Sequence, residues 1–391
     1  MWSVSGTLRG FYDDNYNTAP SGPGKRDSFG FEVSPSLSLN VPLQQTELGL
    51  RYTYGLYYYQ DRESIGANPV DQSHQVDLWV DHAFSERWQG KVQDSLAVGQ
   101  DPELLNAGVP IRVNGDNIHN SGAITLVTQW TRLVGTELSY RNNYYDYTGG
   151  AGTPGNPSYA GLLNRLQHDI SLNLNWRLQP TLLAFVGYQF EQVNYTGNAL
   201  LATVPFPYHS DNRDSRSHYV YVGAQYAPLD NLSLGARAGI QYVDYYNPAA
   251  GTPSTSQLSP YANISATYTY LPGSYVQLGF TQTRNATDVL TFSNTKATLD
   301  QESSIIYAAL NHRITPKLSA NLTGKIQYST FNGGSVDGQA QTWYSLGLNL
   351  GYAFNPHVSA EVGYNFDDLT PQVNGQGYER NRVYLGVTGT Y

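Results

Sequence analysis

Residues 166–176 read Leu-Gln-His-Asp-Ile-Ser-Leu-Asn-Leu-Asn-Trp, and their polarity changes at almost every step. The even positions hold Leu166, His168, Ile170, Leu172, Leu174 and Trp176, and the odd positions hold Gln167, Asp169, Ser171, Asn173 and Asn175. Successive side chains of a β-strand point to opposite faces of its sheet. The stretch therefore predicts a strand with one largely apolar face and one wholly polar face.

The same alternation recurs along the chain. Apolar sets occur at Phe29, Phe31, Val33, Leu37 and Leu39, at Leu232, Leu234, Ala236, Ala238 and Ile240, at Leu318, Ala320, Leu322 and Ile326, and at Val358, Ala360, Val362, Tyr364 and Phe366. Polar residues such as Glu32, Ser34, Arg237, Asn321 and Glu361 stand between them. This repetition predicts an all-β protein.

The composition indicates where such strands would be stable. Only 14% of the 391 residues are charged, against about 25% in average globular proteins, yet the mean hydropathy is −0.43. The chain has 33 Tyr and no Cys. No apolar run reaches the roughly 18 residues of a transmembrane helix. A transmembrane β-barrel fits these facts, because its lipid face is apolar, its lumen is polar and its aromatic residues lie at both interfaces.

Short and long connections alternate between the predicted strands. Short turns include residues 42–45, 178–180 and 271–273, and longer Gly/Pro/Asn/Asp-rich segments lie at about 15–26, 61–72, 99–119, 148–164, 196–215, 247–256, 284–298, 330–339 and 369–378. This pattern predicts a single domain over residues 1–391, an antiparallel up-and-down barrel of about eighteen strands with short periplasmic turns and longer extracellular loops. Both termini would then lie on the periplasmic side. We expect a secretory segment to have been removed before Trp2.

The end of the chain carries a family resemblance. Val383, Leu385, Val387, Gly389 and Tyr391 share one face, and this segment resembles the C-terminal signal by which bacterial barrels are recognised for insertion. With its serial Tyr-rich hairpins, the whole chain resembles the bacterial outer-membrane porins, by pattern rather than by a motif. The resemblance implies an outer-membrane location, contact with lipid and lipopolysaccharide, and passage of small hydrophilic solutes. Some relatives serve polysaccharide export.

Charged residues on the predicted inner face would line the pore. They are Arg9, Glu32, Glu47, Arg51, Asp77, Asp81, Lys91, Glu137, Arg141, Asp169, Glu191, Arg237, Lys325, Glu361 and Asp367. Nine are acidic and six are basic, so we expect a mild preference for cations. The alternative is that these charges pair along the wall and make it rigid.

The connection at residues 99–119 is a candidate constriction loop. It carries Asp101, Glu103, Arg112 and Asp116 among apolar residues such as Leu104 and Ile111. An extracellular loop so rich in apolar side chains is unusual if it stands free in water, and in porins the corresponding loop often folds into the pore. An apolar cap over the barrel rim is the alternative.

Inward-facing aromatic residues and glycines accompany the charges. The aromatic set is Phe11, Tyr57, Trp79, Tyr219, Tyr221, Tyr261, Tyr307, Trp343 and Tyr384, and glycines such as Gly187, Gly279 and Gly363 share the inner face. The rings could form a track for sugars, or they could be interface girdle and luminal filler. The glycines could mark bends or leave room beside large rings. Asp94 would face lipid unless a bulge shifts its strand or the residue lies near a rim of the barrel.

The preferred function is a passive channel for small hydrophilic solutes. The net charge of −9 argues against nucleic acid as a partner, and neither a nucleophile elbow nor His ligand spacing predicts an enzyme, a metal site or a cofactor. The alternatives are a pore for export or uptake of exopolysaccharide or sugar with periplasmic partners, and a non-conducting scaffold for a partner protein. An outer-membrane enzyme is a further alternative, and a homo-oligomer is compatible with each of them.

Overall fold

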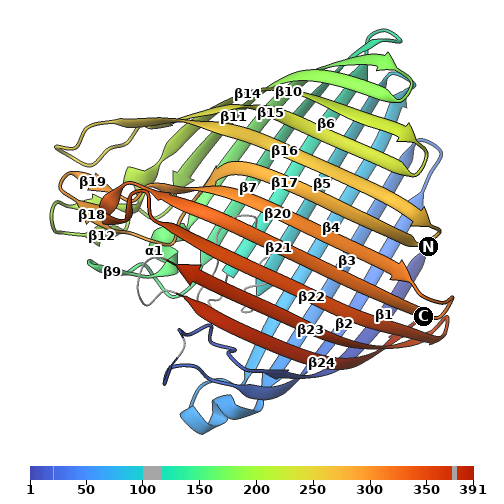
Figure 1. The fold of residues 1–391 in the computed structure, drawn as a ribbon, viewed down its shortest axis with the longest axis horizontal. Coiled ribbons are helices and arrows are strands. Elements are labelled where there is room, and N and C mark those ends of the chain that lie inside the picture. Colours follow the sequence, from blue (N-terminus) through green and yellow to red (C-terminus); the bar gives the residue numbers. More distant parts are fainter. Residues whose placement is uncertain (21, 100–116, 372–376) are drawn as a thin grey trace.

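In the computed structural model, which describes residues 1–20, 22–99, 117–371 and 377–391, the chain forms an 18-stranded antiparallel sheet (Figure 1). Its strands are β1 (Trp2–Asp13), β2 (Ser28–Pro42), β3 (Thr46–Tyr59), β4 (Val70–Ser85), β5 (Trp88–Gly99), β6 (Asn117–Gln129), β7 (Val134–Tyr147), β10 (Arg165–Gln179), β11 (Leu182–Tyr195), β14 (Ser215–Leu229), β15 (Leu232–Tyr245), β16 (Thr255–Leu271), β17 (Ser274–Asn285), β20 (Asp300–Arg313), β21 (Leu318–Asn332), β22 (Ala340–Asn355), β23 (Val358–Pro371) and β24 (Tyr378–Thr390). Strand β1 also pairs with β24, from Ser5 opposite Thr390 to Asp13 opposite Arg382. The sheet therefore closes into a barrel, and the predicted fold is confirmed.

The two ends of the barrel differ. Figure 1 shows both termini at the end with short turns, whereas the long connections and the small elements lie at the other end. Those elements are β8 (Gly152–Thr153), β9 (Asn156–Pro157), α1 (Tyr159–Leu163), β12 (Leu200–Ala202), β13 (Tyr208–His209), β18 (Phe292–Ser293), β19 (Lys296–Ala297) and the 3-10 helices η1 (Gln60–Ile65), η2 (Ser210–Arg213) and η3 (Gly334–Val336). Within the described ranges, no helix is long and apolar enough to cross a membrane.

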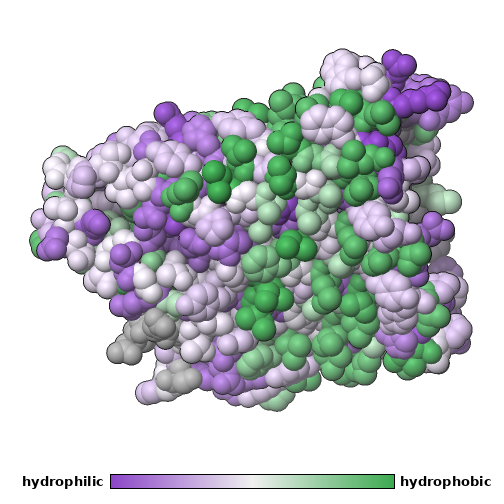
Figure 2. Space-filling model, turned by 45° about the horizontal axis from the view of Figure 1, so that its top comes forward, coloured by the Kyte–Doolittle hydropathy of each residue, from purple (hydrophilic) through white to green (hydrophobic). Residues whose placement is uncertain are grey.

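The two faces of the barrel wall have opposite polarity. On β10, Leu172 is 50% exposed and its neighbour Asn173 only 9%, the reverse of a strand in a soluble protein. Figure 2 shows hydrophobic residues gathered over the strands and hydrophilic residues over the end with the long loops. The apolar face of the alternating pattern is therefore the outer, lipid-facing surface.

Asp94 is an exception to this outer surface. The regular pairing of Asp94 with Leu78 and with Gly122 places it on the outer face, without a bulge at this position. The side-chain amide of Asn120, on the next strand, donates to both carboxylate oxygens at 3.2 Å. Hydrogen bonding to a neighbour on the same face lowers the cost of exposing this carboxylate outside the lumen.

Inner-face glycines sit directly opposite aromatic residues of the next strand. The pairs are Gly30 with Phe11, Gly49 with Trp79, Gly187 with Tyr221, Gly223 with Phe185, Gly279 with Tyr307 and Gly363 with Tyr384. A Cβ added at each of these glycines would overlap the partner ring. The rings therefore lie against bare backbone, as the sequence suggested, and take less of the lumen than they would over larger neighbours.

Candidate functional site

The pairing of the strands places the predicted charged residues on one face of the barrel wall. Arg141 stands opposite Asp169, Asp169 opposite Glu191, Asp81 opposite Lys91, and Asp77 opposite Arg51. Following the pairing from strand to strand puts all fifteen predicted residues on the same face, opposite to the exposed apolar face. These fifteen residues therefore share the inner face of the wall, and their role in lining a pore stays a prediction.

The end of the β17–β20 hairpin leaves the cylinder and bends inward. Pairing of β16 with β17 stops at Ala262 opposite Gln282, although β17 and β20 remain paired up to Asn285 opposite Gln301. The backbone N–H of Arg284 donates to the side-chain oxygen of Gln241 at 3.2 Å, and Gln241 is buried on the inner face of β15. To reach it, β17 must cross the inner side of β16.

Arg213, at the end of η2, anchors this bent hairpin. Its Nη1 donates to the carbonyl oxygen of Leu162 at 2.9 Å and its Nη2 to that of Thr287 at 2.7 Å, while Nε reaches the carbonyl of Leu299 at 3.4 Å. Its side chain is 1% exposed and its guanidinium lies 4.8 Å from the ring centre of Tyr195. One side chain therefore ties together the connections that contain α1, η2 and β18–β19.

Apolar side chains from the same connections form a small core beside Arg213. Its buried members are Tyr147, Ala160, Leu162, Leu163, Leu201, Ala202, Tyr208, Ala249 and Ala297. Except for Tyr147, the last residue of β7, they come from four successive long connections, those after β7, β11, β15 and β17. These connections thus pack into one body, which we call the loop cap (residues 148–164, 196–214, 246–254 and 286–299).

Arg284 fills the opening between β16 and the bent hairpin. Its guanidinium donates to Asp300 at 2.8 Å, to Glu302 at 3.2 Å and to the side-chain oxygen of Gln257 at 3.1 Å, and its Nε donates to the hydroxyl of Ser259. The Arg284 and Asp300 side chains are both 8% exposed. Here side-chain bonds replace the backbone pairing that closes the rest of the wall.

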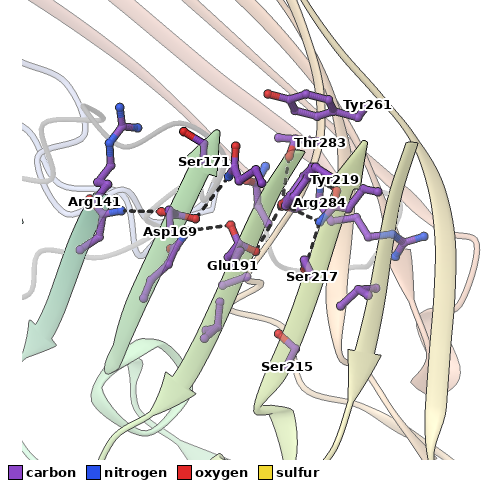
Figure 3. A pocket seen from close by; sticks show the side chains of 18 of the residues that line it. Arg141, Asp169, Ser171, Glu191, Ser215, Ser217, Tyr219, Tyr261, Thr283 and Arg284 are labelled. Carbon is purple, nitrogen blue, oxygen red and sulfur yellow. Dashed lines mark hydrogen bonds between the residues drawn. The ribbon is translucent and has the colours of Figure 1, made fainter. Parts of the chain in front are cut away.

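A cavity of about 560 Å³ lies between the inner wall and the loop cap. Its wall comes from β6 to β17 and from Asp300 of β20, and Arg213, Ala286 and Leu299 of the cap also line it. Figure 3 shows Asp169 and Glu191 on neighbouring strands, with Tyr219, Ser217 and Arg284 beside them. We call this cavity the luminal pocket. Of the predicted pore residues it contains Glu137, Arg141, Asp169, Glu191 and Arg237.

Two carboxylates at the centre of the luminal pocket receive hydrogen bonds from uncharged groups. Glu191 accepts from Gln167 at 2.9 Å and from the hydroxyl of Tyr219 at 3.3 Å, and Asp169 accepts from Gln189 at 3.4 Å. Arg141, in register with Asp169, forms no ion pair with either of them in the described part of the chain. The pair can therefore attract a mobile cation.

The rings of Tyr219 and Tyr261 line the same pocket, and the buried ring of Tyr221 packs against Tyr261. The ring centre of Tyr261 lies 5.0 Å from that of Tyr219 and 5.7 Å from that of Tyr221. The hydroxyl of Tyr221 donates to Asn173 at 2.8 Å, and Arg237 lies 5.6 Å from the centre of its ring. The wall thus combines charges with aromatic faces.

The opposite wall is ion-paired. Arg9 binds Glu32 at 2.8 Å and Glu361 at 2.6 Å, and Arg380 binds the buried Asp13 at 2.5 Å. The alternative role suggested by the sequence, charges paired along the wall, fits this part of the barrel.

The alternating sequence pattern did not identify several charged residues of the interior. They are Asp13, Arg62, Asp71, Arg165, Arg213, Arg284, Asp300, Arg380 and Arg382. Most lie at strand ends or in connections, where the alternating pattern fades. Some of these arginines stack on tyrosine rings, as Arg62 does on Tyr16 and Tyr59. An arginine close to tyrosines in the sequence was the one signal that could have identified them.

The expected constriction residues Asp101, Glu103, Arg112 and Asp116 lie outside the described residues. The luminal pocket is instead bounded by the bent β17–β20 hairpin, a segment to which the sequence assigned no role. Among the described residues, no group of three His, Asp or Glu side chains is arranged to hold a metal ion.

An apolar outside and a polar, charged interior define this closed barrel as a transmembrane barrel of the bacterial outer membrane. Its sequence matches the family described as putative beta-barrel porin 2 over residues 3–391, and the chain belongs to that family. It is an outer-membrane channel protein for small solutes. No curated protein matches the chain.

Solved outer-membrane proteins resemble the chain in structure. The outer membrane protein OpdK of Pseudomonas aeruginosa is 10% identical, with a TM-score of 0.48 over 100% of this chain and 99% of that one. OccK9 (OpdG) of the same organism is 12% identical, with a TM-score of 0.48 over 100% and 98%. OccAB4 of Acinetobacter baumannii is 12% identical, with a TM-score of 0.45 over 100% and 98%. The assignment rests on the family match.

Proposed function

We propose that solutes cross the barrel by passive diffusion through the luminal pocket, and that this channel mildly prefers cations. The observation that carries the proposal is the position of the pocket, between a charged wall and a loop cap that narrows the interior. Barrels of this size leave an aqueous channel unless loops or partners fill it. The loop cap makes the pocket the selective part of the path.

The cation preference follows from the charges that are left after pairing. Glu47, Asp77, Glu137, Asp169 and Glu191 accept hydrogen bonds from uncharged side chains. Of the fifteen predicted wall residues, Arg51, Arg141, Arg237 and Lys325 are the cations without an ion pair in the described part of the chain. Five such carboxylates therefore stand against four such cations in this set, and an excess of one sign favours counter-ions.

A planar bilayer experiment tests both statements. Detergent-folded protein in a potassium chloride gradient should give discrete conductance steps and a reversal potential of the sign set by potassium. An absence of conductance steps would refute the channel function and favour a non-conducting scaffold. Conductance steps with a reversal potential of the sign set by chloride would support the channel and refute the cation preference.

We further propose that transport has no chemical step. The outward histidines that an enzyme could use bind tyrosines rather than a serine: His168 lies 2.8 Å from the hydroxyl of Tyr140, and His218 lies 2.7 Å from that of Tyr188. A phospholipase assay on the folded protein should show no hydrolysis above that of a barrel-free detergent control. Hydrolysis above the control would make the barrel an enzyme.

The half-buried ring of Tyr261 in the luminal pocket favours a second candidate, a pore for sugars. Ring faces pack well against the apolar side of a sugar, while tyrosine hydroxyls bind its polar groups. Liposome swelling compares the two candidates: a sugar pore passes glucose faster than an uncharged non-sugar solute of equal size, whereas a general pore passes both equally.

A further inference from the structure

A second cavity, of about 300 Å³, lies on the extracellular side of the wall. It is lined by parts of the loop cap, by the first residues of β16 and by the β21–β22 connection, including Phe206, Tyr208, Asn212, Thr252, Thr255 and Gln257. Its size lies in the range of small-molecule sites, which begins at about 300 Å³. We call it the outer pocket.

The outer pocket adjoins the luminal pocket. Tyr245 and Leu299 line both cavities, and the hydroxyl of Tyr245 donates to Asp300. Gln257, which lines the outer pocket, receives a hydrogen bond from Arg284, which lines the luminal pocket. A single layer of side chains therefore separates the two.

This layer has no backbone pairing in it. Residues 255–261 of β16 pair with β15, but the pairing of β16 with β17 begins only at Ala262. Across the opening, Arg284 contacts Gln257 and Ser259, and the amide of Gln257 donates to Asn332 of β21 at 2.6 Å. Rearranging these side chains breaks their own hydrogen bonds but separates no strand pair. Rotation of Arg284 and Gln257 would join the cavities without opening the barrel.

The lining of the outer pocket selects for a neutral solute. Phe206 and Tyr208 supply aromatic faces at 6.1 Å between ring centres, and the threonine, asparagine and glutamine side chains supply uncharged hydrogen-bonding groups. Burial raises the pKa of the Tyr208 hydroxyl, so that it stays uncharged. The charged residues of the lining, Lys296 and Asp337, have opposite signs. A bare ion would lose water here without gaining a net counter-charge.

We propose that the outer pocket captures a small neutral polyhydroxylated solute, such as a monosaccharide, and that Arg284 with Gln257 gates its passage into the luminal pocket. This inference rests on the proposed channel function. It adds a lateral route through the wall, separate from any path through the centre of the loop cap.

Thiol labelling tests the route, because the chain has no cysteine of its own. Thr255→Cys places a thiol in the outer pocket. Ser256→Cys, one residue further along β16, is the matched control, because Ser256 is exposed and lines neither described cavity. Both variants are reconstituted in liposomes and treated with a bulky, neutral methanethiosulfonate reagent, and glucose entry is followed by swelling.

Modification of the Thr255→Cys variant should lower the rate of glucose entry at least two-fold, and modification of the Ser256→Cys variant should leave it unchanged. An unchanged rate in the Thr255→Cys variant would overturn the lateral route, and so would an equal loss in both. If the unmodified protein shows neither glucose entry nor ion conductance, the proposed channel function itself fails.

The gate has its own test. Arg284→Gln removes the charge that holds Asp300 and Glu302, and should raise glucose entry, whereas Arg284→Lys keeps the charge and should raise it less. In the Thr255→Cys, Arg284→Gln double variant, thiol modification should abolish the increase. No increase, or an increase that persists after modification, would refute the gate. A difference in migration between unheated and heated samples in a detergent gel verifies that each barrel has folded.

Discussion

Arg213 and Leu162 are joined by a hydrogen bond of 2.9 Å from the arginine Nη1 to the leucine carbonyl oxygen. They belong to different connections, and the same guanidinium also holds Thr287 and Leu299 on a third. The charge is almost fully buried, and its partners are carbonyl oxygens in place of a carboxylate. Arg213 therefore joins three connections of the loop cap through one side chain, in addition to the apolar core and to hydrogen bonds such as that from Asn212 to the carbonyl oxygen of Asn247 at 3.1 Å.

Arg213→Ala should loosen the loop cap without unfolding the barrel. It leaves buried carbonyl oxygens without a donor, at a cost of about 1–3 kcal/mol each, but it touches no strand pairing. We expect higher conductance and faster trypsin cleavage at the exposed Lys296 of the cap. The Arg213→Lys variant keeps one donor group, so its conductance and cleavage rate should lie between those of Arg213→Ala and of the unchanged protein. A conductance and a cleavage rate equal to those of the unchanged protein would show that the apolar core alone holds the cap.

The faces of the wall could be predicted from the sequence, because lipid is a uniform apolar solvent and gives each strand a strict alternation. The pattern from Leu166 to Trp176 assigns Asp169 to the lumen, and even the exceptional Asp94 keeps its predicted outward direction. The loop cap could not be predicted in this way. Arg213 and Arg284 act through partners from 16 to 86 residues away, and nothing in a local pattern of polarity specifies such distant contacts.

The bend of β17 could not be predicted from the sequence. Alternation continues through Leu278 and Phe280, and the pairing of β16 with β17 ends at Gln282. The sequence placed residues 284–298 in a connection, and the apolar content of residues 99–119 drew attention to that loop instead. Loss of pairing between two strands depends on both partners and on the cap above them, so neither strand reveals it alone.

The unpaired carboxylates of the luminal pocket should control ion selectivity. A unit charge about 4 Å from a passing ion contributes about 1 kcal/mol in water, so Asp169→Asn should reduce the cation-to-anion permeability ratio by up to about five-fold. Glu191→Gln should act in the same direction but more weakly. Asp94→Asn removes the same charge from the outer face and serves as the control. Reversal potentials in a salt gradient measure the ratio, and an equal effect of all three variants would contradict a luminal origin.

A deletion tests the predicted role of the apolar loop at residues 99–119 as a constriction of the pore. Deletion of residues 103–113 should raise single-channel conductance if this loop narrows the pore in addition to the bent hairpin. Arg213→Ala in the same deletion background should raise it further, since the two segments would obstruct the path independently. Unchanged conductance after the deletion would refute the constriction role of Asp101, Glu103, Arg112 and Asp116 and leave the hairpin as the narrowing element.

The pairing of Gly279 with Tyr307 should matter for barrel stability. A methyl group on Gly279 overlaps the tyrosine ring, whereas one on Gly324 would meet open space, so these two glycines form a matched pair. Gly279→Ala should lower the free energy of unfolding by about 1–3 kcal/mol, the usual cost of overpacking, because Tyr307 must move off the wall. Gly324→Ala should change it by no more than about 1 kcal/mol, the scale of strand propensities. Urea unfolding of the protein in lipid vesicles, followed by tyrosine and tryptophan fluorescence, measures both. Restoration of the Gly279→Ala variant by Tyr307→Leu would identify the ring as the cause, and equal losses in the two alanine variants would instead point to backbone conformation.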